Sequence, residues 1–252
     1  MPQFMELQAP GAWRTIDFIS DLHLDASDLD TFEAWRRYMR DTPAAAVFVL
    51  GDLFEVWVGD DAASQPGFEA DCAAVMQAAT AHASVFYMHG NRDFLVGEAM
   101  LRSCGVTLLR DPTVFSFAGQ RHLLTHGDSL CLADTDYLVF RDKVRAPAWQ
   151  QEFLARTLDQ RQAIGRDLRA QSEERKNAGV VYVDIDEPEA LRWLEDADAK
   201  VLIHGHTHRP ADHSMANGIT RVVLSDWDAR ATPPRQQVLR LTPGSLQRLP
   251  LA

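Results

Sequence analysis

Cysteine is scarce in this 252-residue sequence, which contains only three. Cys72, Cys104 and Cys131 lie far apart and form no CxxC pair. A disulfide framework and a zinc site built from thiolates are therefore not expected, and a reducing compartment suits the chain better.

Long apolar runs are also missing. No stretch reaches the roughly 18 consecutive apolar residues of a membrane-spanning helix. The N-terminal residues lack the basic start and apolar segment of a secretory signal. These absences predict a soluble cytoplasmic protein, and they leave peripheral contact with a membrane surface open.

Positive charge is in short supply as well. The chain has 25 Lys and Arg against 36 Asp and Glu, which gives a formal net charge of −11. A protein with this charge is repelled by phosphate backbones, so nucleic acid is not an expected partner. No obligate protein partner is inferred from the sequence.

Short apolar runs recur along the chain, and each ends in polar residues, as buried strands do. Helical patterns lie between them. One begins near Asp28 or Asp30, with Glu33 placed for a capping box, and others span 68–81 and 187–197. This alternation predicts an α/β fold. The predicted strands are TIDFIS (15–20), AAVFVLGD (45–52), SVFYMHGN (84–91), RHLLTHGD (121–128) and KVLIHGHTH (200–208).

Two further patterns indicate antiparallel strands, so the sheet arrangement is expected to be mixed. Residues 113–126 predict a hairpin that turns at Gly119 and Gln120. Residues 221–227 and 236–242 predict a second antiparallel pair.

Residues 134–179 lack strand patterns and read as helical. The segment contains nine basic residues, and apolar residues recur at helical spacing within it. We expect an inserted helical cap there, on a core formed by residues 1–133 and 180–252.

Polar side chains follow the five predicted strands. Ligands of α/β sheets bind outside the carboxyl ends of strands, so we expect these side chains to converge. Strand alternation would place Asp21 and His23 on one face, and His206 and His208 likewise, with His204 as a support beneath them. The candidate metal ligands are Asp21, His23, Asp52, Asn91, His126, His206 and His208.

These side chains are more numerous than one metal ion needs, and they suit two ions. Nitrogen and oxygen donors without sulfur favour Mn²⁺, Fe²⁺ or Zn²⁺ over Mg²⁺ or Ca²⁺. Asp52 is the natural bridge, because its carboxylate has two oxygens for two ions. Two such ions about 3.5–4 Å apart can polarise a phosphoryl group and hold a hydroxide for in-line attack. Glu55, Trp57, Asp60 and Asp61 are expected either to be loop structure or to support the metal ligands from outside.

The ordered set of motifs over residues 15–210 resembles that of the calcineurin-like metallophosphoesterases. The resemblance implies a metallophosphoesterase double β-sandwich with αββα layers. It also implies that one metal is held by Asp21, His23, Asp52 and His208, and the other by Asp52, Asn91, His126 and His206. The motifs are Asp21-x-His23, Gly51-Asp52, Gly90-Asn91, His126-Gly127-Asp128 and Gly205-His206-x-His208.

Arg92 departs from the pattern of many family members, which have histidine after the Gly-Asn pair. Arginine cannot donate a proton near neutral pH, but it can clamp a phosphate through two hydrogen bonds. A leaving group that is itself a phosphate needs no proton donor. The substitution therefore favours a pyrophosphate bond as the substrate, and the alternative is that Arg92 only pairs with Asp93.

Longer stretches, GDLFEVWVGDD, GNRDFL and HGHTHRP, resemble the UDP-2,3-diacylglucosamine pyrophosphatases of lipid A biosynthesis. The resemblance implies Mn²⁺-dependent cleavage to UMP and 2,3-diacylglucosamine 1-phosphate at the cytoplasmic face of the bacterial inner membrane. Hydroxide activated by the two metals would attack the UMP-side phosphorus. The apolar cap would receive the acyl chains, and its basic residues would meet phosphates and lipid heads. The implied catalytic residues are Asp52, Asn91, Arg92 and His206, and the implied substrate contacts are Asn91, Arg92, Asp134, Ser172, Lys176 and His206.

Two other functions stay open. The same site could act on a soluble nucleotide or phosphodiester. Higher activity on small nucleotides than on the lipid would indicate that function. The fold could also be a binding module with a degenerate metal site, although no ligand of the set is missing.

Overall fold

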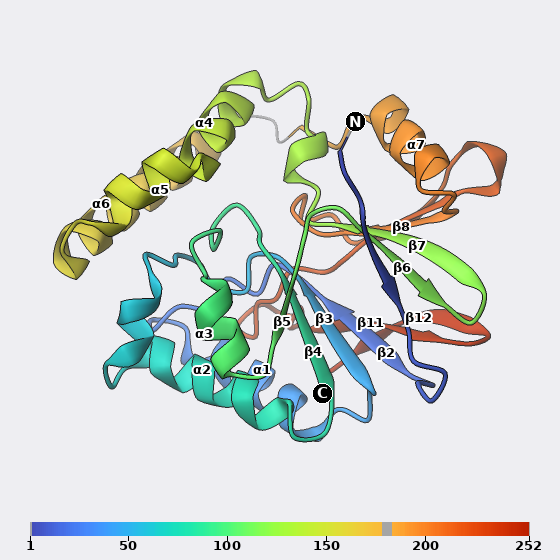
Figure 1. Ribbon diagram of the computed structural model, residues 1–252, viewed down its shortest axis with the longest axis horizontal. Helices are drawn as coiled ribbons and strands as arrows, with labels where there is room; N and C mark the ends of the chain where they lie inside the picture. Colours follow the sequence, from blue (N-terminus) through green and yellow to red (C-terminus); the bar gives the residue numbers. More distant parts are fainter. Residues whose placement is uncertain (1, 178–182, 252) are drawn as a thin grey trace.

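Two mixed six-stranded β-sheets pack face to face at the centre of the molecule (Figure 1). The computed structural model describes residues 2–177 and 183–251, apart from the side chains of residues 171–177. The first sheet has the order β1 (Met5–Gln8), β6 (Thr113–Phe117), β7 (Gln120–Thr125), β8 (Val201–His204), β10 (Thr220–Val223), β9 (Ala211–Ser214). The second has the order β12 (Ser245–Pro250), β11 (Gln237–Thr242), β2 (Ile16–Ile19), β3 (Ala46–Leu50), β4 (Ser84–Met88), β5 (Thr107–Leu109).

Alternation along the strands builds three apolar layers. In β3, Phe48 points between the sheets and its ring centroid lies 4.8 Å from that of Phe115 on β6. Its neighbours Val47 and Val49 pack on the other side, against α1 (Leu29–Asp41), α2 (Phe68–Ala79) and α3 (Glu98–Ser103). Trp193 of α7 (Glu187–Asp196) covers the outer face of the first sheet. The predicted double sandwich with αββα layers is confirmed.

All five predicted strands are present, and the polar motifs lie in the loops that follow them. The predicted hairpin is β6 and β7, which pair antiparallel. Its turn lies one residue earlier than expected, at Ala118 and Gly119, whose φ angles of 50° and 78° give the left-handed turn that hairpins favour. Short 3₁₀ helices span Asp60–Ser64, Asp128–Leu130 and Ala216–Gly218.

The second antiparallel pair predicted from the sequence is wrong. Strand β10 lies in the first sheet, between β8 and β9, whereas β11 lies in the second, between β12 and β2. Both strands are largely buried, so each needs a neighbour on both edges, and the loop between them crosses from one sheet to the other.

The predicted capping box of the first helix is also wrong. Asp28 caps α1 and accepts hydrogen bonds from the backbone nitrogen and the hydroxyl of Thr31. Glu33 lies beyond the capping position and pairs instead with Arg36 on the exposed face of the helix.

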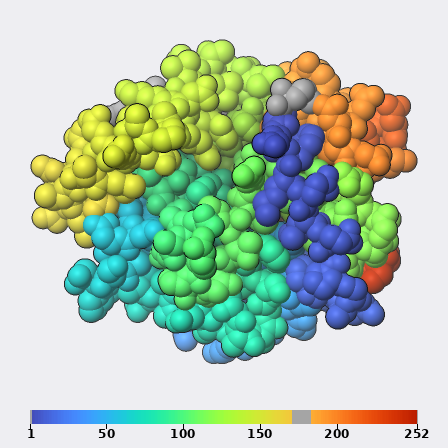
Figure 2. Space-filling model, in the orientation of Figure 1, coloured from blue at the N-terminus to red at the C-terminus, as the bar shows by residue number. Residues whose placement is uncertain are grey.

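Helices α4 (Thr135–Arg145), α5 (Pro147–Leu154) and α6 (Leu158–Asn177) lie together outside the sandwich (Figure 1). Figure 2 shows them packed against the core, and the rings of Trp149 and Phe94 lie 6.3 Å apart across this contact. Several basic side chains of the segment point inward: Arg141 pairs with Asp128, and Arg161 with Asp61. No described helix is long and apolar enough to cross a membrane.

Candidate metal centre

The seven predicted ligands gather where β2, β3, β4, β7 and β8 end. Most of them adopt the left-handed backbone conformation, which costs a non-glycine residue about 1–3 kcal/mol. Strand alternation therefore does not place them, contrary to our expectation, because the chain has already left the strands. The left-handed ligands are Asp21 (φ 55°), His23 (49°), Asp52 (51°), His206 (66°) and His208 (52°).

The first group of ligand atoms surrounds one oxygen of Asp21. Its Oδ1 is buried, has no hydrogen-bond partner among the described residues, and lies 3.3 Å from Nε2 of His208 and 3.9 Å from Nε2 of His23. Those two nitrogens lie 3.2 Å apart. The other oxygen of Asp21 accepts hydrogen bonds from the Ser20 hydroxyl (2.7 Å) and the His206 backbone nitrogen (2.9 Å), which fixes the carboxylate.

The second group surrounds the side-chain oxygen of Asn91. This oxygen lies 3.0 Å from Nε2 of His126 and 2.9 Å from Nδ1 of His206. The Nε2 atom of His126 is also 3.8 Å from Oδ2 of Asp52. The Nδ1 atom of His126 lies 3.0 Å from the carbonyl oxygen of Leu50, which holds the ring in place.

Asp52 lies between the two groups. Its Oδ2 atom is 3.9 Å from Nε2 of His23 and 3.8 Å from Nε2 of His126. Its Oδ1 atom accepts a hydrogen bond of 2.8 Å from the backbone nitrogen of Arg92. One oxygen of Asp52 therefore faces both groups, whereas the sequence led us to expect one oxygen for each.

The sequence pattern of the calcineurin-like phosphoesterases matches residues 14–210. The chain belongs to this family. A UDP-2,3-diacylglucosamine hydrolase of Cellvibrio japonicus is 41% identical over 83% of this phosphoesterase and 90% of its own length. A UDP-2,3-diacylglucosamine hydrolase of Chromobacterium violaceum is 44% identical over 94% of this chain and 98% of its own length. A solved archaeal phosphodiesterase is similar in fold alone, with 12% identity, a TM-score of 0.50, and coverage of 94% of this chain and 99% of its own.

The ligand atoms of this phosphoesterase suit divalent cations. Separations of about 3 Å between neighbouring donors are those of ligands that share an ion at about 2.1 Å. Burial lowers the pKa of His126, but the carboxylates of Asp52 and Asp21 outweigh it and raise that pKa to about 9. Burial raises the pKa of Asp52 to about 6. A site that attracts positive charge this strongly can exchange its protons for a metal ion.

Arg92, the predicted phosphate clamp, lines the cavity over the candidate ligands. Its guanidinium Nη1 atom is 3.6 Å from Oε1 of Glu55, so Arg92 does not pair with Asp93 alone. Asp93 accepts hydrogen bonds from the backbone nitrogens of Gly90 (2.7 Å) and Leu53 (2.8 Å). The alternative interpretation of Arg92 as a mere partner of Asp93 is therefore set aside.

The other predicted residues lie farther from the ligands. His204 is a buried support, as expected: its Nε2 atom accepts a hydrogen bond from Arg221, and burial lowers its pKa to about 3. Asp134 caps α4 through a hydrogen bond from the Tyr137 backbone nitrogen (3.2 Å). Ser172 and Lys176 fall on the last turns of α6, and the side chains of these two residues lie outside the described part of the structure.

A network around Asp128 was missed by the sequence analysis. This buried carboxylate accepts hydrogen bonds from the Tyr137 hydroxyl (2.5 Å) and from Nε of Arg141 (2.8 Å). Arg145 lies 3.6 Å from it and donates to the carbonyl oxygen of Gly90 (2.8 Å). Burial opposes ionisation of Asp128, but the two arginines hold its pKa well below the ordinary value. The spacing of four residues between these three helical partners was the available signal.

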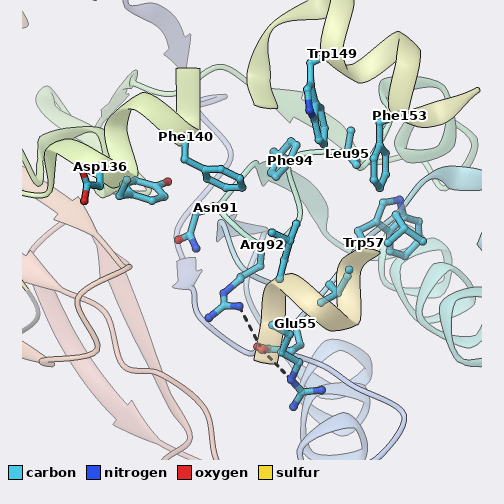
Figure 3. Close-up of a pocket in the computed structure, with 16 residues that line it drawn as sticks. Glu55, Trp57, Asn91, Arg92, Phe94, Leu95, Asp136, Phe140, Trp149 and Phe153 are labelled. Atoms are coloured by element: carbon cyan, nitrogen blue, oxygen red, sulfur yellow. Dashed lines mark ion pairs between the residues drawn. The ribbon is translucent and has the colours of Figure 1, made fainter. Parts of the chain in front are cut away.

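Two cavities meet at the site. One of about 260 Å³ lies over the candidate ligands and includes His23, Asp52 and His206 in its lining. The other, of about 270 Å³, lies under the three outer helices and is lined mainly by apolar side chains. Asn91 and Arg92 line both cavities. Figure 3 shows these two residues at the edge of a pocket walled by Trp57, Phe94, Leu95, Phe140, Trp149 and Phe153.

Proposed function

We propose that this phosphoesterase hydrolyses UDP-2,3-diacylglucosamine to UMP and 2,3-diacylglucosamine 1-phosphate. Relatives that are 41% and 44% identical over most of the chain bear the name of that hydrolase. The observation that carries the proposal is the pair of adjoining cavities. Because Asn91 and Arg92 line both, a ligand there can place phosphates over the metal ligands and an apolar portion beneath the outer helices.

In this proposal the diacyl portion binds in the apolar cavity. Aromatic side chains from the core (Trp57 and Phe94) and from the helices (Phe140, Trp149 and Phe153) line it together. Burial of acyl methylene groups there is favourable by about 0.8 kcal/mol each. We accordingly assign residues 134–179 to a cap that holds the lipid, and residues 1–133 and 180–252 to the core. Contacts of Asp134, Ser172 and Lys176 with substrate belong to the same proposal.

The seven ligands would hold two divalent ions, and Mn²⁺ suits their mixture of nitrogen and oxygen donors. When bound, such ions polarise a phosphoryl group and activate water. Water adds to the UMP-side phosphorus, and the anhydride bond to the second phosphate breaks. The departing sugar phosphate is a stable anion, so no protein proton donor is required. Arg92 steadies the phosphates, and Asn91 and His206 orient them.

Membrane contact through the outer helices completes the proposal. The described structure has six large apolar side chains that are well exposed, and all but Leu29 lie between residues 132 and 168. Val139 is the most open of them, at 72% exposure. Of these, Val139 and Leu154 belong to α4 and α5 and line neither cavity, so they can contact the cytoplasmic leaflet of the inner membrane, where a diacylated substrate resides.

The test is release of UMP from the diacylated substrate after chelation and after addition of Mn²⁺. We expect no turnover in the chelated protein and restored turnover with Mn²⁺. Asp52→Ala removes the shared ligand and should reduce turnover by at least about 10²-fold, with the fold retained by circular dichroism.

Soluble UDP-sugars and a phosphodiester serve as competing substrates. Faster cleavage of these compounds than of the lipid would favour the soluble nucleotide or phosphodiester alternative. Absence of turnover on every substrate in Mn²⁺-loaded protein would reject the hydrolase.

A further inference from the structure

Glu55 contacts the first group of ligands from outside. It lies in the loop after β3 and is largely buried, with its Oε2 atom 2.8 Å from Nδ1 of His23. The Nε2 atom of the same ring is the one that faces Asp21 and His208. The two atoms are close, although their alignment is not that of a hydrogen bond. A carboxylate beside the remote nitrogen favours the proton there and leaves the facing nitrogen free to bind a cation.

The backbone holds this carboxylate opposite His23. The backbone nitrogen of Glu55 donates to the carbonyl oxygen of Leu24 (3.1 Å), and that of Leu24 donates to the carbonyl oxygen of Leu53 (2.8 Å). The loops that follow β2 and β3 are thus joined directly beside the ligands. Glu55 therefore has a fixed place relative to His23.

The second oxygen of Glu55 faces two arginines. Its Oε1 atom lies 3.6 Å from Nη1 of Arg92 and 3.3 Å from Nε of Arg169. Arg92 comes from the loop after β4, and Arg169 comes from the outer helix α6 and also pairs with Asp25 at 3.3 Å. One of the dashed lines in Figure 3 marks the contact between Glu55 and Arg92 at the rim of the pocket. One carboxylate thus joins a ligand histidine, the phosphate clamp and the cap.

We propose that Glu55 is a positioning residue with two separable tasks, which rest on the proposed hydrolysis. One oxygen sets the proton position and orientation of His23 for metal binding. The other holds Arg92 and Arg169 over the metal ligands, where they meet the phosphates of the substrate. Because both arginines line the apolar cavity, the second task also fixes where the lipid and diphosphate portions meet.

Two substitutions separate the tasks. Glu55→Gln keeps an oxygen that can accept a hydrogen bond from His23, but it has no charge for the arginines. Glu55→Ala removes both functions. Glu33→Gln is the matched control, because Glu33 is a half-exposed glutamate whose partner is Arg36 on the outer face of α1.

Metal binding is measured without turnover, by titrating chelated protein with Mn²⁺ and following free Mn²⁺ by electron paramagnetic resonance. Glu55→Ala should weaken binding of at least one ion by about 10–100-fold. Glu55→Gln and the control should bind like the parent protein. Unchanged affinity in the alanine variant, or equal losses in both Glu55 variants, would overturn the first task.

Steady-state kinetics with saturating Mn²⁺ test the second task. Glu55→Gln should raise KM for the diacylated substrate severalfold with a smaller change in kcat. Arg169→Gln should raise KM less in the Glu55→Gln background than in the parent, because the two residues act together. An unchanged or lower KM, or strictly additive effects, would overturn this task. Failure of the parent protein to release UMP would instead reject the proposed function and leave the metal titration readable.

Discussion

At the scale of single residues, strain and close packing define the site. The backbone nitrogen of Asp21 donates to the carbonyl oxygen of Gly51 (3.1 Å), and that of His23 donates to the carbonyl oxygen of Asp52 (3.0 Å). These bonds hold the left-handed ligand residues of two loops against one another. Backbone conformations of this kind persist where the surroundings determine them, and they cluster at functional sites.

A substitution at Gly90 tests whether this close packing holds the ligands in place. A Cβ atom at this position would lie 2.0 Å from Oδ1 of Asp52 and 2.3 Å from its backbone nitrogen, so Gly90→Ala must displace the shared ligand. We expect a loss of Mn²⁺ affinity of at least about tenfold, together with a comparable loss of turnover. Gly244→Ala is the control, because its Cβ would meet nothing within 4 Å. Equal Mn²⁺ binding by the two variants would contradict this account.

At the scale of helices and strands, local patterns were predictable and pairing was not. Strand β3 was found because every side chain in it is apolar and buried. The pairing of β10 with β9 was not predicted, because β9 has the polar sequence ADHS and carries no strand pattern. The ligand types were visible at strand ends, but which oxygen of Asp52 faces both groups depends on a hydrogen bond from the distant Arg92 loop.

The contact between α4 and the core predicts how a substitution at Arg141 changes stability. Arg141 donates to the buried Asp128, and that carboxylate would retain Tyr137 and Arg145 if Arg141 were lost. Arg141→Met should therefore lower the free energy of unfolding by about 1.5–3 kcal/mol, measured by urea denaturation.

Arg156→Met is the control for this substitution. Arg156 follows the end of α5, and its exposed side chain pairs with Glu152 of that helix, so its loss should change stability by less than about 1 kcal/mol. Equal stability of the two variants would mean that the Asp128 network does not anchor the helix.

At the scale of the whole molecule, charge and apolar surface are distributed unequally. The net charge of −11 opposes approach to an anionic membrane, so we expect the proposed attachment to depend on local apolar residues. Four of the basic side chains in the outer helices, Arg141, Arg145, Arg161 and Arg169, contact core carboxylates instead of extending to solvent. For the membrane contact proposed above, exposed apolar residues of the same helices are therefore the expected source of affinity.

Val139→Glu tests that conclusion, because it places a charge at the most open apolar position of α4. Val139 lines neither cavity at the site. The variant loses about 1.5 kcal/mol of favourable apolar burial. Its affinity for phosphatidylglycerol-containing vesicles, measured by sedimentation, should therefore fall about tenfold. Leu29→Glu makes the same change at an exposed apolar residue of α1 and should leave sedimentation unchanged. If both variants sediment like the parent protein, the outer helices are not the surface that meets the lipid.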